Sequence, residues 1–199
     1  MSIEIERWER KKGAGSIQRA GIDQGDTLLD FGSGYGHYSI PGATVVDKSG
    51  TVYAADIRGE PLSKTIEKTS KHGLTNIKNI NTPEREPLRF EFPSIDDVFL
   101  FDILHYFEKD KRKKRYRELY RVLKPGGKLF VYPKHTEDDF PMGELKGLKK
   151  EEVVEEVCEE WLSLDEKICR KTAHGEEVSL GVIFKFMKTD DLSVSEGGT

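Results

Sequence analysis

The sequence predicts an α/β fold with a doubly wound, mostly parallel sheet that ends in an antiparallel hairpin. Two observations support this. Short apolar runs alternate with amphipathic segments through at least five units, and parallel strands need helical crossovers of this kind. Near the end of the chain, two β-rich runs are separated only by TAHGEE, as is typical of a hairpin.

Residues 1–21 are expected to form an N-terminal helical segment. A strand at TLLDF follows, and a glycine loop then leads into a helix. Pro41 limits the start of this helix to residues 38–40, because proline is tolerated in a first turn. The next expected elements are a strand at 51–57, a helix at 61–73 with Leu62 and Ile66 on its buried face, and a strand at 76–81.

The second half predicts the remaining strands and helices. The proline-rich segment 82–94 is expected to be a loop, and DDVFLFDIL a buried strand. In the basic helix KDKRKKRYRELYRVL, Tyr116 and Leu119 recur at helical spacing, so its charges predict a solvated face rather than a nucleic-acid surface. KPGG predicts a type II turn, KLFVYP a strand, and KKEEVVEEVCEEWL a helix with Trp161 on its apolar face. Residues 22–188 would form the main domain, and residues 189–199 a flexible tail.

Composition narrows the class of protein. The 199 residues suffice for one domain, and a net charge of −4 does not indicate a dedicated binder of nucleic acid or anionic membranes. Cys158 and Cys169 form no CxxC or metal-binding pattern, as expected of reduced thiols. Since no apolar signal region or bilayer-spanning run occurs, we expect a cytoplasmic protein that does not associate with membranes.

The sequence LLDFGSGYGHYSIP places Gly32, Gly34 and Gly36 between the first strand and the first helix. Glycines allow a tight turn and a close approach of a ligand to the backbone, and the helix start offers free N–H groups. Asp56 ends the second strand, where its carboxylate can accept hydrogen bonds from both hydroxyls of a ribose. Such features occur in sites for dinucleotides and for S-adenosylmethionine. A glycine-rich turn without a ligand is the alternative.

The spacing favours one of these cofactors. The dinucleotide fingerprint GxGxxG has glycine at its sixth position, where this chain has His37, and a histidine would obstruct close packing of helix and strand. The chain instead has an acid, Asp30, two residues before GxGxG. An NAD-dependent oxidoreductase is therefore the less favoured alternative.

Five segments occur in an order and spacing shared with one enzyme family: LLDFGSGYGHYSIP, GTVYAADI, LTNIKNI, DDVFLFDILHYF and RVLKPGGKLFVYP. Over about residues 17–132 the chain resembles the class I S-adenosylmethionine-dependent methyltransferases, most of all the small-molecule group of the ubiquinone-biosynthesis type. The resemblance implies a seven-stranded Rossmann-like fold, with the hairpin as its last two strands. It also implies S-adenosyl-L-methionine as cofactor and methyl transfer as activity.

The resemblance implies a set of cofactor-binding residues near the ends of the first four strands. They are Asp30, Gly32, Gly34, Gly36, Asp56, Ile57, Thr82 and Phe101. The glycines would face the methionine part and the ribose, and Asp30 would orient the loop and reach the amino group. Asp56 would bind the ribose hydroxyls, Ile57 would pack on the adenine, and Phe101 would offer main-chain contacts.

Adenine recognition departs from the family pattern. The family often has an Asp after the third strand that binds the adenine amino group, whereas here the nearest groups are Asn81, Thr82 and Glu84. A non-catalytic S-adenosylmethionine-binding protein is therefore an alternative to an enzyme.

The chemistry needs no catalytic triad, because the sulfonium already carries an activated methyl group. A general base is needed only for a protonated acceptor, and the candidates are His37, Asp102, His105 and His135. The histidines have no tight ligand spacing, so no metal site is expected.

We expect a small-molecule methyl acceptor. Few residues are available to cover the acceptor side, which would be open, closed by residues 1–21, or completed by a second subunit of a homodimer. An open site leaves nucleic acid or protein acceptors as alternatives. The acceptor atom does not follow from the sequence.

Overall fold

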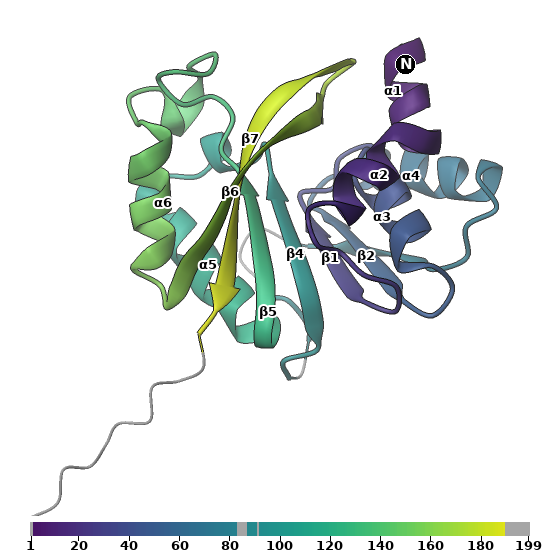
Figure 1. Ribbon diagram of the computed structural model, residues 1–199, viewed down its shortest axis with the longest axis horizontal. Coiled ribbons are helices and arrows are strands. Elements are labelled where there is room, and N and C mark those ends of the chain that lie inside the picture. The colour runs from purple at the N-terminus through teal and green to yellow at the C-terminus, as the bar shows by residue number, and fades with distance from the viewer. Residues whose placement is uncertain (1, 83–86, 91, 190–199) are drawn as a thin grey trace, which may run out of the picture.

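The computed structural model describes residues 2–82, 87–90 and 92–189, and its centre is a seven-stranded sheet (Figure 1). The strands are β1 (Thr27–Phe31), β2 (Thr51–Asp56), β3 (Ile77–Asn81), β4 (Ile95–Phe101), β5 (Leu123–Tyr132), β6 (Leu162–His174) and β7 (Glu177–Lys188). The α-helices are α1 (Ile3–Arg7), α2 (Gly13–Gln18), α3 (Ser39–Val46), α4 (Gly59–Lys71), α5 (Lys109–Val122) and α6 (Lys150–Cys158). A π-helical turn, η1 (Trp8–Lys12), joins α1 to α2, and η2 (Leu104–Tyr106) and η3 (Gly143–Leu145) are 3₁₀ turns.

The strand order is β3-β2-β1-β4-β5-β7-β6. Strands β1 to β5 pair in parallel, while β7 lies antiparallel between β5 and β6. The predicted doubly wound sheet with a C-terminal antiparallel hairpin is thus confirmed. Since the connections run in opposite directions from β1, the topological switch point lies between β1 and β4, where ligands bind in such sheets.

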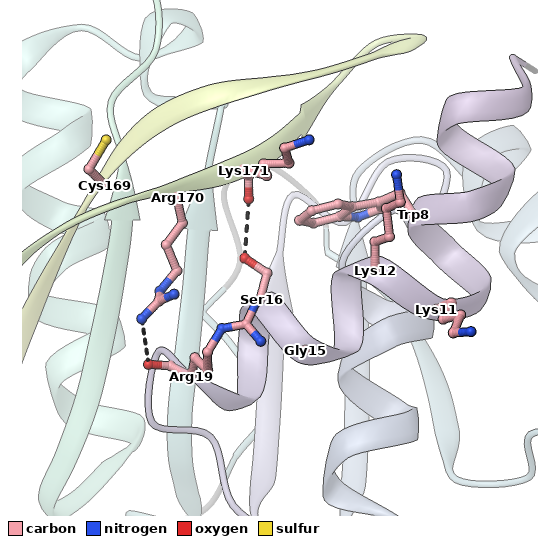
Figure 2. Close-up of a pocket in the computed structure, with 9 residues that line it drawn as sticks. All are labelled: Trp8, Lys11, Lys12, Gly15, Ser16, Arg19, Cys169, Arg170 and Lys171. Carbon is pink, nitrogen blue, oxygen red and sulfur yellow. Dashed lines mark hydrogen bonds between the residues drawn. The ribbon is translucent and has the colours of Figure 1, made fainter.

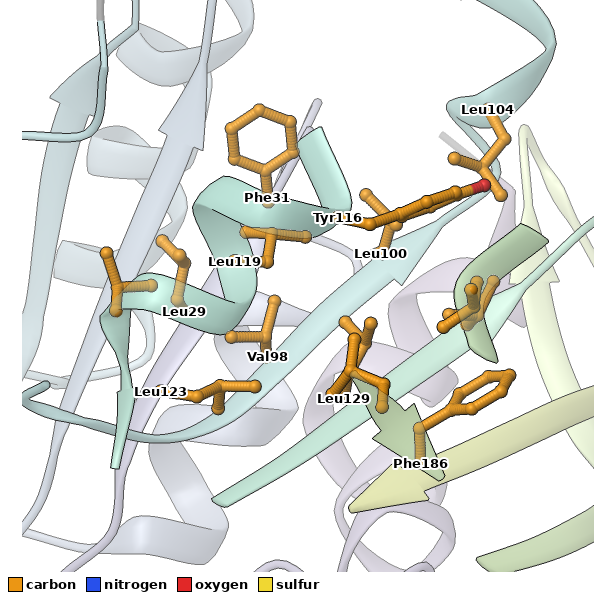
Figure 3. Packing of buried hydrophobic residues seen from close by; sticks show 14 of the residues in the cluster. Leu29, Phe31, Val98, Leu100, Leu104, Tyr116, Leu119, Leu123, Leu129 and Phe186 are labelled. Carbon is orange, nitrogen blue, oxygen red and sulfur yellow. The ribbon is translucent and has the colours of Figure 1, made fainter. Parts of the chain in front are cut away.

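Helices cover both faces of the sheet (Figure 1), and successive residues of a strand belong to different core clusters. On β4, Val98 and Leu100 join a core cluster with α5 and α6, whereas Phe99 joins a second cluster with α1 to α3. Figure 3 shows part of the first cluster, in which Tyr116 and Leu119 come from α5. Burial on both faces explains the continuous apolar runs in the sequence.

The N-terminal residues belong to this second cluster. Trp8 is 1% exposed, packs edge-on against Tyr38, and donates its indole N–H to the backbone oxygen of His37 at 2.7 Å. The segment thus packs on α3 and the strands behind it. None of the described helices is long and apolar enough to cross a membrane.

Two local predictions were wrong. Ile66 is 56% exposed, and Thr65 takes the buried position beside Leu62. Trp161 is 62% exposed because α6 ends at Cys158. The KPGG segment falls within the bounds of β5, but the pairing with β4 moves from Leu123 to Lys128 across it, and Gly126 has the positive φ of +72° that the predicted turn needs.

Two predicted segments are described only in part. Residues 87–90 and 92–94 contain no helix or strand, as expected of a loop, while 83–86 and 91 lie outside the described residues. Of the predicted tail, only residue 189 is described.

The basic run on α5 faces acidic residues at the end of α6 and directly after it. Lys113 pairs with Glu159, and Arg117 pairs with Glu160. Arg112 is buried and binds Glu156 through two parallel hydrogen bonds of 2.8 and 2.7 Å. Much of this positive charge is therefore balanced within the protein rather than presented to a partner.

Candidate cofactor site

A cavity of about 320 Å³ opens at the carboxyl ends of β1, β2 and β3. Its volume is in the range of small-molecule sites. Its lining residues are Phe31, Gly32, Asp56, Ile57, Arg58, Thr82, Ile103, Tyr106, Phe107 and Arg115. Four of the residues predicted from the sequence, Gly32, Asp56, Ile57 and Thr82, therefore line one cavity beside the switch point.

Asp56 connects this cavity to the glycine loop. It is 5% exposed, and its Oδ2 accepts the backbone N–H of Gly34 at 2.8 Å. Its Oδ1 accepts the backbone N–H of Arg58 at 2.9 Å and the Arg58 Nε–H at 3.3 Å. A carboxylate has about four lone-pair positions, so Oδ2 keeps one free, and Oδ1 gains one if the exposed Arg58 side chain moves away. This capacity matches the two hydroxyls of a ribose.

Gly32 contributes backbone without a side chain to the cavity wall. Its φ is +84°, and a Cβ at this position would lie 2.5 Å from Cγ2 of Ile103, which also lines the cavity. The N–H groups of Gly32 and Ser33 both donate to the backbone oxygen of Ala55. The loop is therefore held against β2, and a side chain at Gly32 would occupy the space of its neighbour.

Gly36 offers a direct test of the loop geometry. Its φ is +78°, and an added Cβ would lie 2.9 Å from both Cγ2 and Oγ1 of the fully buried Thr65. We expect Gly36→Ala to lower the free energy of unfolding by about 1–2 kcal/mol, because a left-handed conformation is costly for alanine. Urea titration measures the effect. Gly59→Ala is the matched control, since no atom lies within 4 Å of its Cβ, and an equal loss in both variants would contradict the prediction.

Asp30 and Phe101 lie behind the cavity rather than in its wall. Asp30 is 2% exposed and accepts the Ser39 hydroxyl at 2.5 Å. The pKa of Asp30 is raised to about 7, mainly by burial and to a smaller extent by the nearby charge of Asp56, while the Ser39 hydrogen bond opposes the shift. Phe101 packs against the rings of Tyr38 and Phe99. Any contact of Asp30 with a ligand therefore needs a bridge, such as water.

In the part of the cavity wall formed by the ends of β2 and β3, Ile57 is half exposed and Thr82 donates its backbone N–H to the Asp56 carbonyl at 3.0 Å. Glu84 lies outside the described residues. The sequence did not identify Arg115, which extends from α5 over the Phe31 ring at 5.2 Å. Arg115 was not singled out because it belongs to a basic run that has the pattern of a solvated helix face.

The candidate bases fall into two groups. His37 lies apart, with its Nδ1 2.7 Å from Glu9, which also accepts Lys68 Nζ at 2.6 Å. Burial alone would raise the pKa of Glu9, but its hydrogen bonds with His37 and Lys68 hold it below the usual value. His37 therefore takes part in a contact that joins the N-terminal segment to α4.

Asp102, His105 and His135 come together, as the other group. Asp102 Oδ1 is 3.2 Å from His135 Nε2 and 3.8 Å from His105 Nδ1, and Asp102 Oδ2 contacts His174 Nδ1. Burial lowers the pKa of His105 to about 4. His174 was missed because it lies on the closing hairpin, far along the chain. Beside this group, Tyr106 connects to the cofactor cavity, since its ring is 3.9 Å from that of His105.

A second cavity of about 380 Å³ lies between the N-terminal segment and β6 (Figure 2). Its cations are Lys11, Lys12, Arg19, Arg170 and Lys171. The Ser16 hydroxyl donates to the Lys171 carbonyl, and Arg170 donates to the Arg19 carbonyl, so hydrogen bonds close one side of it. None of the cofactor-binding or catalytic residues predicted from the sequence lines this cavity.

Comparisons with known proteins agree with the geometry of the first cavity. Residues 28–127 match the family described as a methyltransferase domain. The ubiquinone/menaquinone biosynthesis C-methyltransferase UbiE of Citrobacter koseri is 34% identical over 134 residues, which cover 66% of this chain and 50% of the relative. The chain thus spans about half the length of the curated relatives that it matches.

Solved structures confirm the fold. An S-adenosylmethionine-dependent methyltransferase from Aquifex aeolicus has a TM-score of 0.71 at 23% identity and covers 92% of this chain and 93% of its own. The [4+2]-cyclase SpnF reaches 0.70 at 16% identity, with 89% and 81% covered, so this fold also hosts other chemistry. The fold alone does not separate a methyltransferase from such a cyclase, but the match to the family does. The chain belongs to the class I S-adenosylmethionine-dependent methyltransferase domains.

Proposed function

We propose that the protein transfers the methyl group of S-adenosylmethionine to a small-molecule acceptor. The observation that carries this proposal is the buried Asp56 carboxylate. It accepts a hydrogen bond from the glycine loop and keeps hydrogen-bonding capacity toward the cavity. The name of the Citrobacter relative puts acceptors that react at carbon among the first to test.

In this proposal the cofactor supplies the activated methyl group, and the chain binds, orients and excludes water. Asp56 holds the ribose, Ile57 packs on the adenine, and Gly32 lets the backbone approach the ligand. The acceptor lies toward Tyr106, where the cavity adjoins the cluster around Asp102. A base is required only for a protonated acceptor, and that cluster provides the candidates.

A binding protein without catalysis is the second candidate, favoured by the lack of an acid at Asn81 and Thr82, where the resemblance implies one. Incubation of the protein with methyl-labelled S-adenosylmethionine and a small-molecule extract separates the two. Label in extract components supports the enzyme. Saturable cofactor binding without transfer to small molecules, RNA or protein supports the binder.

Replacing Asp56 by alanine tests the cofactor site itself. We expect the dissociation constant for S-adenosylmethionine to rise about 5- to 150-fold, because two ribose hydrogen bonds worth about 1–3 kcal/mol in total are lost. Calorimetric titration with S-adenosylmethionine and S-adenosylhomocysteine measures this, with NADH as a negative control. Asp110→Ala, at an exposed acid on α5, should bind like the wild type. An unchanged dissociation constant for Asp56→Ala would falsify the assignment.

A further inference from the structure

We propose that Asp102, His135 and His174 bind a divalent transition-metal cation on the acceptor side of the cofactor cavity. The three residues follow β4, follow β5 and end β6, so only the folded sheet brings them together. One ligand atom from each lies within 4.8 Å of the others. Neither the glycine loop nor the cofactor contacts proposed above require such a cluster.

The hydrogen bonding of His135 argues for a cation. Its Nδ1 is 2.9 Å from the carbonyl oxygen of Phe140, which can only accept, so Nδ1 carries a proton. In a neutral imidazole Nε2 then presents a lone pair, and this atom is buried with no hydrogen-bond donor among the described residues. It faces Asp102 Oδ1, which is also buried without a donor, at 3.2 Å. Two electron-rich atoms therefore face each other, and a cation between them satisfies both.

This pattern is typical of metal ligands. A metal-bound histidine usually donates its other N–H to a carboxylate or a backbone carbonyl, which fixes its tautomer and its orientation. His135 makes that bond to Phe140, and the residue is 1% exposed. Its ring is thus oriented before any ligand arrives.

The surrounding groups set the choice of metal. His174 is one-third exposed, which gives an ion a route from solvent and leaves room for a further ligand. His105 is 4% exposed, neither of its ring nitrogens has a hydrogen-bond partner among the described residues, and its Nδ1 lies 3.8 Å from Asp102 Oδ1. Imidazoles with one carboxylate suit Zn²⁺, Fe²⁺, Co²⁺ or Ni²⁺ rather than Mg²⁺ or Ca²⁺.

The backbone of the cluster is also unusual. Asp102 and His135 have positive φ values of +55° and +72°, an uncommon region for residues other than glycine in which Asp, Asn and His are enriched. Such conformations persist where the surrounding structure enforces them, often at functional sites. Here both of them aim a ligand side chain at the same point.

The location gives the ion a role that rests on the proposed function. Ile103, the neighbour of Asp102, lines the cofactor cavity, as does Tyr106 beside His105. A hydroxyl acceptor that coordinates the ion releases its proton to water, because a Lewis acid lowers its pKa. The oxygen then forms the bond to the methyl carbon, the carbon–sulfur bond breaks with its electron pair passing to sulfur, and S-adenosylhomocysteine leaves. With the ion bound, the substrate class is therefore a small molecule with an ionisable, metal-coordinating hydroxyl, which is an alternative to the carbon acceptors that the name of the Citrobacter relative suggests.

Titration of the chelator-treated protein with Co²⁺ and Zn²⁺ tests the site. We expect one Co²⁺ per chain, with visible absorption bands that Zn²⁺ abolishes by displacement. His174→Gln and Asp102→Asn should each weaken binding by more than about 10-fold, since loss of an outer-sphere partner alone costs that much. Asparagine tolerates the positive φ of Asp102, so this variant should still fold.

His72→Gln, at the end of α4 and outside the cluster, is the matched control and should bind Co²⁺ like the wild type. Absence of saturable binding, or equal affinity in His174→Gln and His72→Gln, overturns the proposal and leaves a proton shared between His135 and Asp102 as the explanation. Calorimetry with S-adenosylmethionine on the same metal-free protein keeps the two ideas apart. Cofactor binding without metal binding defeats only the ion, and metal binding without cofactor binding defeats only the proposed function.

Discussion

The effect of Asp30→Asn on the free energy of unfolding is expected to depend on pH. At pH 8 this effect should be about 3–4 kcal/mol more favourable than at pH 4. The reason is that burial raises the pKa of Asp30 from 3.8 to about 7, and each pKa unit corresponds to about 1.4 kcal/mol. Asparagine has nearly the same shape as the protonated acid and carries no charge. It can still accept the Ser39 hydroxyl.

The sign follows from the protons bound in each state. Between pH 3.8 and about 7 the unfolded chain has released the Asp30 proton, whereas the folded protein retains it. The unfolded state binds fewer protons in this window, so the contribution of Asp30 to stability falls as the pH rises. Asp97, with a pKa raised to about 8 mainly by burial, acts in the same direction but is present in both proteins and cancels.

Urea titrations of both proteins at pH 4, 6 and 8 measure the effect, and Asp110→Asn on the exposed face of α5 is the control. Parallel pH profiles for wild type and Asp30→Asn would contradict the buried-acid explanation. We also expect Asp30→Asn to bind S-adenosylmethionine more weakly at pH 8, because a cationic amino group gains from an ionised Asp30. A gain in stability with a loss of affinity is the usual trade-off at a functional site.

The parts of the site that the sequence predicted are those set by local chain order. Asp56 was recognised because it ends a strand at a fixed distance after the glycine loop, and the parallel register pairs Phe31 with Ala55 beside it. Gly32 was recognised because a tight strand-to-helix turn needs its positive φ, which is +84°. The geometry of the loop and the position of the acid follow from such local signals once the sheet is parallel.

The residues that were missed depend on contacts between distant segments. His174 reaches Asp102 only because β7 lies between β5 and β6, and no spacing in the sequence encodes that arrangement. Trp161 was predicted to lie on the apolar face of a helix. It instead lies beyond the end of α6, where its φ of +61° is not helical, and its ring lies 5.9 Å from that of Tyr120. Helical periodicity does not reveal where a helix ends.

Arg112→Met is expected to lower the free energy of unfolding by about 3–5 kcal/mol, because it removes one partner of a buried ion pair. Arg112 is 2% exposed and binds both carboxylate oxygens of Glu156, which is 4% exposed. Methionine retains much of the apolar packing, so the loss reports mainly the Glu156 carboxylate, which among the described residues keeps only the more distant Lys109 Nζ at 3.9 Å. Denaturant titration at neutral pH measures it.

The double variant Arg112→Met with Glu156→Leu separates charge from packing. Since it leaves no buried charge behind, we expect it to recover most of the lost stability. Lys64→Ala, which breaks an exposed pair with Glu67, should cost less than about 1 kcal/mol. If Arg112→Met cost no more than Lys64→Ala, the pair between α5 and α6 would behave as a surface contact.

This ion pair also reaches the cofactor site. Arg112 Nη1 donates to the carbonyl oxygen of Phe107 at 2.8 Å, and Phe107 lines the cavity. The double variant should therefore regain stability but bind S-adenosylmethionine more weakly than the wild type, because the Phe107 carbonyl has lost its donor. Restored stability together with restored affinity would instead mean that packing alone positions Phe107, and that Arg112 only joins the two helices.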